Sequence, residues 1–508
     1  MDYLQRLLID RSIEGYQAGK LTRREFLRHL AIIGGGSVLG LTLLGNLSCG
    51  SPEATPTQDQ LKIHLAAAPP DPPNILFIVI DTLRADHVSS YGYERSTSPN
   101  IDNLAKQGAL FEKAFSTAPY TAPAHASLLT GRYPHDHGVQ WVTRKPIFDG
   151  RYLTLPEALR ARGYRTAAFS ANRFWFTREQ GFGRGFTRFD DTFRSPVKMA
   201  TRTIYGHTIE ETIIKGIFED YPWRRRASEV NSSVLRWLKQ DSAKPFFAFL
   251  NYFDVHDPYF APQPHRSRFS VLENPGGILN SYQDRFNPKL TPQQIQNEID
   301  AYDGAISYVD DHIARLLTQI QDLGLGNNLL VIITSDHGEA FGEHGTFLHP
   351  NSVYLEEIHV PLVLWQPGRI PAGVRVSQPV TNAALPATIM HLIAKGGQDV
   401  FPIQSLTPFW ENPEALPDSP LPLVEMEHWP WMYQKAPSSQ GAMRSLISPK
   451  YHYIEHETLG TELYDWQQDP QELRNLANSQ EGQAVIDWFK GLLELDSSAS
   501  RGAKLAIR

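Results

Sequence analysis

Three almost uninterrupted apolar runs constrain this sequence most. They occupy residues 74–80, 245–250 and 329–334. Runs of this kind are typical of strands buried on both faces of a parallel sheet. The first run leads directly into Asp81, and the last leads into Asp336 and His337. Because open α/β sheets bind ligands at the carboxyl ends of their strands, these polar residues mark a candidate site.

A helical pattern lies between the second and third runs. Apolar residues recur every three or four positions from Ile299 to Ile320, which predicts one buried helix face. Strands that alternate with helices predict an α/β domain over residues 74–400. Residues 401–508 form a smaller predicted unit, with short strands near 443–454 and a helix from about 480 to 494. The 508 residues suffice for a large core and such an accessory unit.

The N-terminal segment has the pattern of an export signal. Residues 22–27 read Thr-Arg-Arg-Glu-Phe-Leu and resemble a twin-arginine signal. The apolar run that follows, at 31–44, is shorter than the roughly 20 residues that cross a bilayer. This predicts export across the cytoplasmic membrane to the periplasm or the cell surface. A basic amphipathic helix is the alternative interpretation.

The single cysteine of the chain, Cys49, stands just after the apolar run in a sequence that resembles a lipobox. We therefore expect residues 1–49 to be a lipoprotein signal and residues 50–73, rich in Ser, Pro, Thr and Ala, to be a flexible linker. An incidental cysteine in a cleaved signal is the alternative. One cysteine excludes an intrachain disulfide and a cysteine-based zinc cluster.

The charge balance argues against a nucleic-acid partner. The chain has 48 basic and 55 acidic residues, a formal net charge of −7. Nucleic-acid-binding domains usually carry a basic excess. Contact with a membrane is expected only through a lipid anchor at Cys49.

The stretch 120–134 is the most informative about chemistry. Thr121 precedes a predicted helix, with Pro123 in the first turn, where proline is tolerated. Its hydroxyl would lie at the positive end of the helix dipole, where anions bind readily. A metal ion held by nearby carboxylates would lower the pKa of this hydroxyl and make it a useful nucleophile. The alternative is a helix-capping threonine without chemistry.

Five blocks, in order, resemble the sulfatase family of the alkaline phosphatase superfamily. They lie at 74–86, 128–132, 159–166, 334–362 and 462–476. The block at 128–132 reads Leu-Leu-Thr-Gly-Arg and matches the second half of the family's nucleophile motif. The resemblance implies a large mixed, mostly parallel sheet sandwiched by helices, as in alkaline phosphatase, and a smaller C-terminal α+β subdomain.

Several residues depart from the usual family motif. Thr121 occupies the position of the cysteine or serine that sulfatases oxidise to formylglycine, and threonine cannot form that aldehyde. His125 replaces the arginine of the motif, and Thr82 stands where many sulfatases have a second aspartate. Asn172 and Arg173 stand where a Gly-Lys-Trp-His block is expected. These changes resemble superfamily branches that use one metal ion and a threonine nucleophile to transfer phosphoryl groups.

The resemblance implies a set of site residues. The implied ligands of one divalent ion, Ca²⁺, Mn²⁺ or Zn²⁺, are Asp81, Thr121, Asp336 and His337. The implied catalytic residues are Thr121, His256 and His125. The implied substrate-binding residues are Arg132, His349 and Asn172. A further expectation is that Glu339 and His344 orient His337. A second metal ion, held with the help of Asp254 and Asp257, is an alternative to the single-ion site.

The resulting hypothesis is a metal-dependent hydrolase that cleaves phosphate or sulfate esters through Thr121. A phosphomonoester, phosphodiester or phosphonate is slightly favoured, because a sulfothreonyl ester would be harder to discharge. The substrate would be a small molecule, a glycan or a lipid headgroup ester. The alternatives are an arylsulfatase-like sulfuric ester hydrolase and an inactive, lipid-anchored binding protein.

Overall fold

The computed structural model describes residues 71–140, 151–191, 224–240, 244–279, 288–393, 400–411, 421–430 and 435–505. The signal and lipid-anchor predictions for residues 1–49, and nearly all of the 50–73 linker, lie outside these ranges and stay predictions. The elements below belong to one of two compact units, which comprises His64–Asp191 and Arg225–Arg508. In the described part of the chain, no helix combines the length and the apolar character that a membrane span requires.

Each of the three apolar runs forms a strand of one eight-stranded sheet. Strand β1 (Asn74–Ile80) lies between β6 (Phe246–Tyr252) and β7 (Leu329–Thr334) and pairs in parallel with both. The sheet order is β12-β2-β11-β7-β1-β6-β4-β5, and β11 runs antiparallel to its neighbours. The other strands are β2 (Ala109–Phe111), β4 (Arg165–Ser170), β5 (Arg188–Asp190), β11 (Leu362–Trp365) and β12 (Val374–Val376). The sheet is therefore mixed but mostly parallel, as expected.

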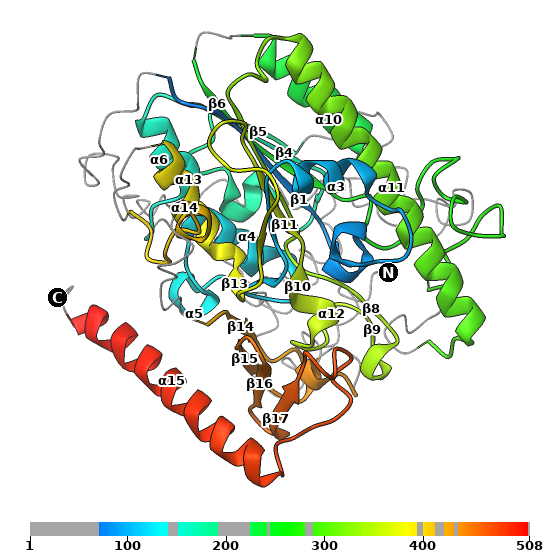
Figure 1. Cartoon of the computed structure of the whole chain (residues 1–508), viewed down its shortest axis with the longest axis vertical. Helices are drawn as coiled ribbons and strands as arrows, with labels where there is room; N and C mark the ends of the chain where they lie inside the picture. Colours follow the sequence, from blue (N-terminus) through cyan, green and yellow to red (C-terminus); the bar gives the residue numbers. More distant parts are fainter. Residues whose placement is uncertain are drawn as a thin grey trace, which may run out of the picture. The chain divides into compact units, whose positions relative to one another are not determined.

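Alternating side chains of β1 belong to two cores, one on each face of the sheet. Leu76 and Ile78 pack in the first core, and Phe77 and Val79 pack in the second. The helices of the first core are α3 (Pro99–Lys106), α10 (Ala227–Leu238) and α11 (Pro292–Asp322). The helices of the second core are α4 (Thr121–Thr130), α6 (Leu155–Ala161) and α13 (Leu385–Ile393). Figure 1 shows these two helical layers on opposite sides of the sheet.

The predicted helix at 299–320 lies within α11. Thr291 caps its first turn, because its hydroxyl accepts the N–H of Gln294 and the Gln294 side chain accepts the N–H of Thr291. This reciprocal pair satisfies two backbone donors that a helix start leaves open. The helix begins one turn or more before the apolar pattern, since its first residues are exposed and polar.

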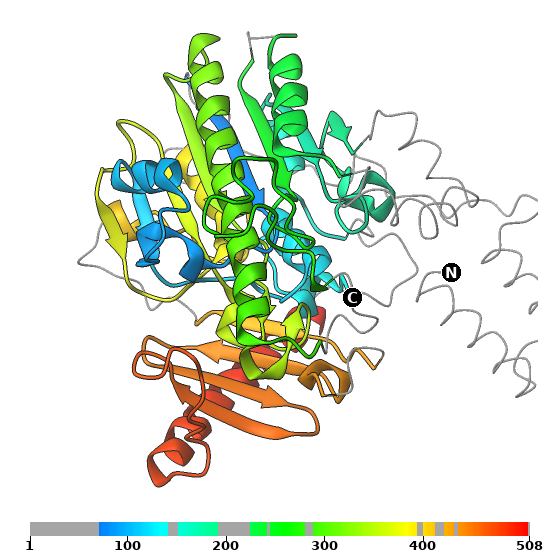
Figure 2. The ribbon, with the colours of Figure 1, turned by 90° about the vertical axis from the view of Figure 1, so that its right-hand side faces the viewer.

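A separate antiparallel sheet follows in the chain and forms its own layer in Figure 2. Its strands, in spatial order, are β14 (Leu423–Met426), β15 (Met443–Ile447), β16 (Tyr451–His456) and β17 (Gly460–Asp465). One face packs on helix α15 (Gln480–Leu505) through Tyr453 and Phe489. The other face packs through Val424 and Ile454 in a core that contains Tyr120. The predicted C-terminal α+β subdomain is thus present, with a longer final helix.

His344 joins this C-terminal layer to the loop that follows β7. Its Nδ1 lies 2.9 Å from Glu356 Oε1, and its Nε2 lies 3.2 Å from the carbonyl oxygen of Glu472. Burial opposes protonation, but the hydrogen bond and charge of Glu356 outweigh it and raise the pKa of His344 to about 9. The protonated ring therefore stabilises the fold.

We predict that this stabilisation is full below about pH 6.5 and is lost as the pH rises through about 9, because the folded state holds the proton more tightly than the unfolded state. His344→Asn is the suitable variant, since asparagine tolerates the left-handed backbone (φ 51°) found here. In thermal unfolding, the melting temperatures of wild type and variant should differ most below about pH 6.5. A difference that stays constant from about pH 6 to pH 10 would refute the prediction.

Candidate active site

Two neighbouring strand ends bring three buried side chains together. Asp81 follows β1, and Asp336 and His337 follow β7, so the parallel pairing of these strands places all three at one edge of the sheet. Each offers one ligand atom, and these atoms all lie within 4.8 Å of one another. The structure thus assembles three of the four implied metal ligands.

The fourth implied ligand, Thr121, is the first residue of α4. Tyr120, not Thr121, occupies the N-cap position, and its side chain makes no capping hydrogen bond. Instead, Thr121 Oγ1 lies 3.4 Å from His337 Nε2. At the other end, Gly131 closes the helix in the left-handed conformation. The capping interpretation is therefore wrong, and the hydroxyl faces the Asp–His cluster at the positive end of the helix.

The two carboxylates each hold one oxygen by hydrogen bonds and leave the other without a donor. Asp81 Oδ2 accepts the side-chain N–H groups of Asn172 (3.0 Å) and Asn251 (3.2 Å). Asp336 Oδ1 accepts the backbone N–H groups of Thr82 (3.2 Å) and His337 (3.0 Å). Asp81 Oδ1 and Asp336 Oδ2 are buried and accept no hydrogen bond. Such atoms are costly unless a cation balances them, so the donor set fits a metal ion.

The histidine of the cluster is oriented to act as a ligand. His337 Nδ1 lies 3.0 Å from the carbonyl oxygen of Gly338, which fixes the proton on Nδ1 and leaves the lone pair of Nε2 toward Thr121. Burial lowers the pKa of His337 well below its usual range, and the nearby His349 adds to this shift. A neutral imidazole is the form that binds metal ions.

The electrostatics of the two carboxyl groups also favour a bound cation. Burial raises the pKa of Asp81 well above its usual value, and repulsion from Asp336 adds to the shift. Burial also raises the pKa of Asp336, to about 7. Two buried carboxylates this close favour a proton in the absence of a cation, and a divalent ion removes that repulsion.

His125 is fully buried in the first turns of α4 and contacts the cluster there. Its Nδ1 is 3.0 Å from the carbonyl oxygen of Thr121 and 3.4 Å from Asp336 Oδ2, and its ring centroid is 4.4 Å from that of Phe176. Burial lowers its pKa to about 3, so the ring is neutral. These contacts fit a residue that positions the first turn of α4 against Asp336.

The predicted catalytic residue His256 and the predicted substrate contact His349 lie together beside His337. The His349 ring centroid is 4.3 Å from that of His337 and 5.0 Å from that of His256. His349 Nδ1 lies 2.7 Å from Glu339 Oε1, and Tyr259 donates its hydroxyl to Glu339 Oε2 at 2.7 Å. Burial disfavours the Glu339 carboxylate, but the charge and hydrogen bond of His349 lower its pKa overall.

Two expectations about residues near His337 are wrong. Glu339 orients His349 rather than His337, and His344 contacts Glu356 and Glu472 instead. The sequence could not show this, because chain proximity to His337 does not fix where a side chain points after a sharp turn.

Other implied contacts lie apart from the cluster. Arg132 follows the C-terminal end of α4, about 14 Å along the helix from Thr121, and its guanidinium lies 4.2 Å from the ring centroid of Tyr152. Asp254 accepts the backbone N–H of Ala227 at the start of α10, a capping role rather than a second metal site. Among the described residues, no second group of three His, Cys, Asp or Glu side chains is placed to hold an ion.

The sequence reasoning missed Asn251, which ends in the site because β6 pairs with β1. Its Oδ1 accepts the backbone N–H of Asn172 at 3.0 Å, while its Nδ2 donates to Asp81. Asn172, implied as a substrate contact, likewise donates to Asp81. The available signal was a carboxamide at the end of an apolar strand that neighbours the Asp81 strand.

We predict that Asn251→Leu weakens divalent metal binding by about 10- to 100-fold, because Asp81 then loses one of the two donors that orient it. The matched control is Asn231→Leu, another buried asparagine, which bonds Tyr252 and the carbonyl of His312 away from Asp81. Isothermal titration with Mn²⁺ or Zn²⁺ should show weaker binding only in the first variant. Equal affinities in both variants would contradict the role of Asn251.

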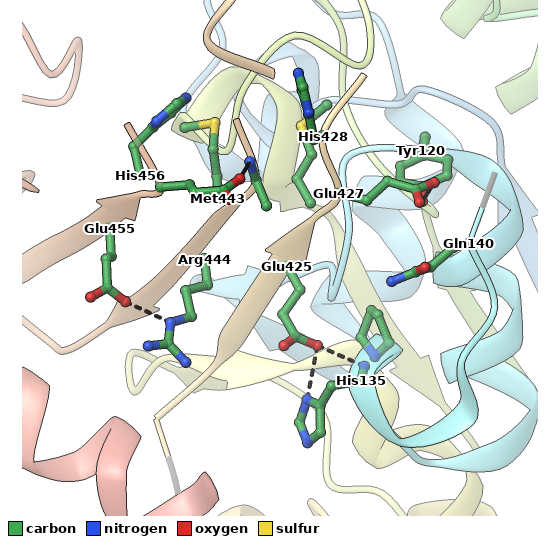
Figure 3. A pocket seen from close by; sticks show the side chains of 14 residues that line it. Tyr120, His135, Gln140, Glu425, Glu427, His428, Met443, Arg444, Glu455 and His456 are labelled. Atoms are coloured by element: carbon green, nitrogen blue, oxygen red, sulfur yellow. Dashed lines mark hydrogen bonds and ion pairs between the residues drawn. The ribbon is translucent and has the colours of Figure 1, made fainter. Parts of the chain in front are cut away.

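A cavity of about 540 Å³ lies between α5 (Pro134–His137) and strands β14, β15 and β16. Figure 3 shows Tyr120, His135, Glu425 and Arg444 around it. Its walls are already paired internally: Glu425 accepts from His135, and Tyr120 donates to Glu427. Tyr120 precedes Thr121 in the chain, but none of the four implied metal ligands lines this cavity.

Comparison with known proteins agrees with this geometry. The sulfatase family model matches residues 73–395. Mouse iduronate 2-sulfatase is 26% identical over 393 residues, covering 68% of this chain and 69% of its own length. An arylsulfatase of Clostridium perfringens is 22% identical over 466 residues, covering 83% and 93%.

Solved structures of similar fold include an enzyme that is not named as a sulfatase. The phosphonate monoester hydrolase of Agrobacterium radiobacter superposes with a TM-score of 0.64 at 22% identity, covering 84% of this chain and 96% of that one. It shares the alkaline phosphatase-like fold. The match over 73–395 includes the strands that carry Asp81 and Asp336 and the helix that begins at Thr121. The chain belongs to the sulfatase family and is a hydrolase that acts on ester bonds.

Proposed function

We propose that this protein hydrolyses phosphoesters through a covalent intermediate on Thr121. The observation that carries the proposal is the position of the Thr121 hydroxyl, 3.4 Å from His337 Nε2, at the N-terminus of a buried helix and facing two carboxylates. Threonine cannot supply the aldehyde hydrate of the usual sulfatase reaction. The hydroxyl itself is therefore the candidate nucleophile.

The cluster would hold one divalent ion through Asp81, Asp336, His337 and Thr121. When bound, such an ion lowers the pKa of a coordinated hydroxyl and neutralises anionic oxygens. The protein holds both carboxylates and the imidazole in place through Asn172, Asn251 and the Gly338 carbonyl. Little reorganisation is then needed at the moment of reaction.

In the first half of the reaction, the Thr121 hydroxyl releases its proton to solvent, Oγ forms a bond to phosphorus, and the bond from phosphorus to the leaving oxygen breaks. The leaving oxygen takes a proton from a nearby acid, for which His256 and the Glu339-bound His349 are placed beside His337. In the second half, water attacks the phosphothreonine at phosphorus, and the bond from phosphorus to Thr121 Oγ breaks. One proton of the water passes to Oγ, which restores the hydroxyl. The backbone N–H groups at the start of α4 favour the added negative charge.

Phosphorus is preferred over sulfur on chemical grounds. A phosphothreonyl ester can be attacked at phosphorus by water, whereas a sulfothreonyl ester is harder to discharge without the aldehyde hydrate. Phosphoryl transfer also depends mostly on positioning and charge neutralisation, which this cluster offers. The Agrobacterium radiobacter neighbour named as a phosphonate monoester hydrolase supports this preference. The relatives named as sulfatases make sulfate esters the second candidate.

The test is turnover of one matched aryl series after loading with Mn²⁺, Zn²⁺ or Ca²⁺. The series comprises the phosphomonoester, the methyl phosphodiester, the phenylphosphonate monoester and the sulfate of the same phenol. We expect the largest kcat/KM for one of the three phosphorus esters. A larger kcat/KM for the sulfate would overturn the phosphoester assignment, and no turnover with any ion would favour a binding protein.

A further inference from the structure

The segment that follows β4 ties an exposed aromatic side chain to the metal ligand Asp81. Asn172 donates through Nδ2 to Asp81 Oδ2, and its Oδ1 accepts the backbone N–H groups of Phe174 (3.1 Å) and Trp175 (2.9 Å). The buried carboxamide of Asn172 thus links Asp81 to the backbone of Phe174 and Trp175. The backbone nitrogen of Phe174 therefore lies within about 9 Å of Asp81 Oδ2.

The segment is also held in place by the packing of Phe176. Phe176 packs 4.4 Å from His125 and 5.0 Å from Phe182, measured between ring centroids. His125 in turn contacts Thr121 and Asp336. The side chain of Thr177 accepts the N–H of Gln180 at the start of the turn that contains Phe182. Two buried contacts, through Asn172 and through Phe176, hold the segment to the catalytic cluster.

Phe174 stands out on this anchored segment because 47% of its surface is exposed. The Arg173 guanidinium carbon lies over the ring, 4.6 Å from its centroid. This contact orients the ring through a cation–π interaction and occupies one of its faces. A large exposed aromatic side chain whose backbone is held this close to the metal-ligand cluster is suited to stack on a planar part of a ligand.

We propose that Phe174 is a specificity-determining residue that stacks on an aromatic leaving group of the substrate. The inference rests on the proposed function and narrows it to esters whose leaving alcohol carries a planar ring. The neighbouring Arg173 places positive charge at the edge of the same surface, which favours rings that bear an additional anionic substituent. Phe174 takes no part in bond making.

The test compares Phe174→Ala with the wild type, both metal-loaded, on a phenyl and an ethyl ester of the same phosphoryl group. We expect kcat/KM for the phenyl ester to fall about 10-fold, since ring stacking contributes at this scale. For the ethyl ester it should change less than about twofold. Phe174→Tyr should restore the phenyl preference. The control is Leu473→Ala, a residue 71% exposed in the C-terminal layer, which should alter neither value.

Equal losses for both esters, or no loss for either, would overturn the role of Phe174 while leaving the proposed function intact. If the wild type turns over no ester, the proposed function fails, and binding then decides the inference. Phenylphosphonate and methylphosphonate are titrated into the metal-loaded protein. Phe174→Ala should weaken the binding of phenylphosphonate and leave the binding of methylphosphonate unchanged. An equal effect on both ligands would refute the stacking role.

Discussion

Thr121→Ala should lower kcat at least about 10³-fold on the best ester, because the variant retains the three other metal ligands, Asp81, Asp336 and His337, but has no atom to attack phosphorus. Thr121→Ser keeps the hydroxyl and should retain activity within about 10-fold of the wild type. Thr121→Val is the closest match in shape and should be as inactive as the alanine variant. The three variants therefore separate the hydroxyl from the volume of the side chain.

Two further measurements make the result specific to a nucleophile. Quenched wild-type reactions should yield the peptide that contains Thr121 with one phosphoryl group attached, and Thr121→Val should yield none. Metal titration of Thr121→Val measures how much of its loss comes from a missing ligand. Substantial turnover by Thr121→Val at full metal occupancy would show that another group, or water, attacks the ester.

Removal of divalent ions should abolish turnover and lower thermal stability. The buried oxygens Asp81 Oδ1 and Asp336 Oδ2 have no donor, so an ion that binds them also stabilises the folded chain. At a 100-fold excess over Kd, binding stabilises by about 2.7 kcal/mol. Asp336→Asn should lose both the activity and this increment. The control is Asp310→Asn, which should keep the increment. Asp310 is a buried carboxyl that accepts backbone N–H groups at the start of α3 instead of those of the cluster.

The same experiment has a defined pH dependence. Because burial raises the pKa of Asp336 to about 7, the ion-free folded state holds a proton there that the unfolded state has lost. The contribution of this proton to the stability of the ion-free protein should therefore be full below about pH 4 and decline as the pH rises through about 7. The ion replaces that proton, so the gain in melting temperature should grow over the same range. A gain that shrinks with rising pH would contradict the assignment of the site.

Much of the fold could be predicted because its signals are local. Apolar runs at 74–80 and 329–334 and the periodicity of 299–320 mark strands and a helix without reference to any partner. The parallel pairing then brings Asp81 and Asp336 to one edge of the sheet. Arg132 illustrates the limit: it belongs to a matching motif, yet the helix carries it to the opposite end from Thr121.

The sequence by itself determined the family, the α/β architecture and the three side chains that could hold an ion, since each depends on residue type and order along the chain. Only the tertiary structure decided which carboxylate oxygens stay free, because Asn172 and Asn251 reach Asp81 from other strands. It also decided that His349, not His337, is the partner of Glu339. Hydrogen bonds between distant segments depend on how strands and loops meet in space, and no local pattern encodes that meeting.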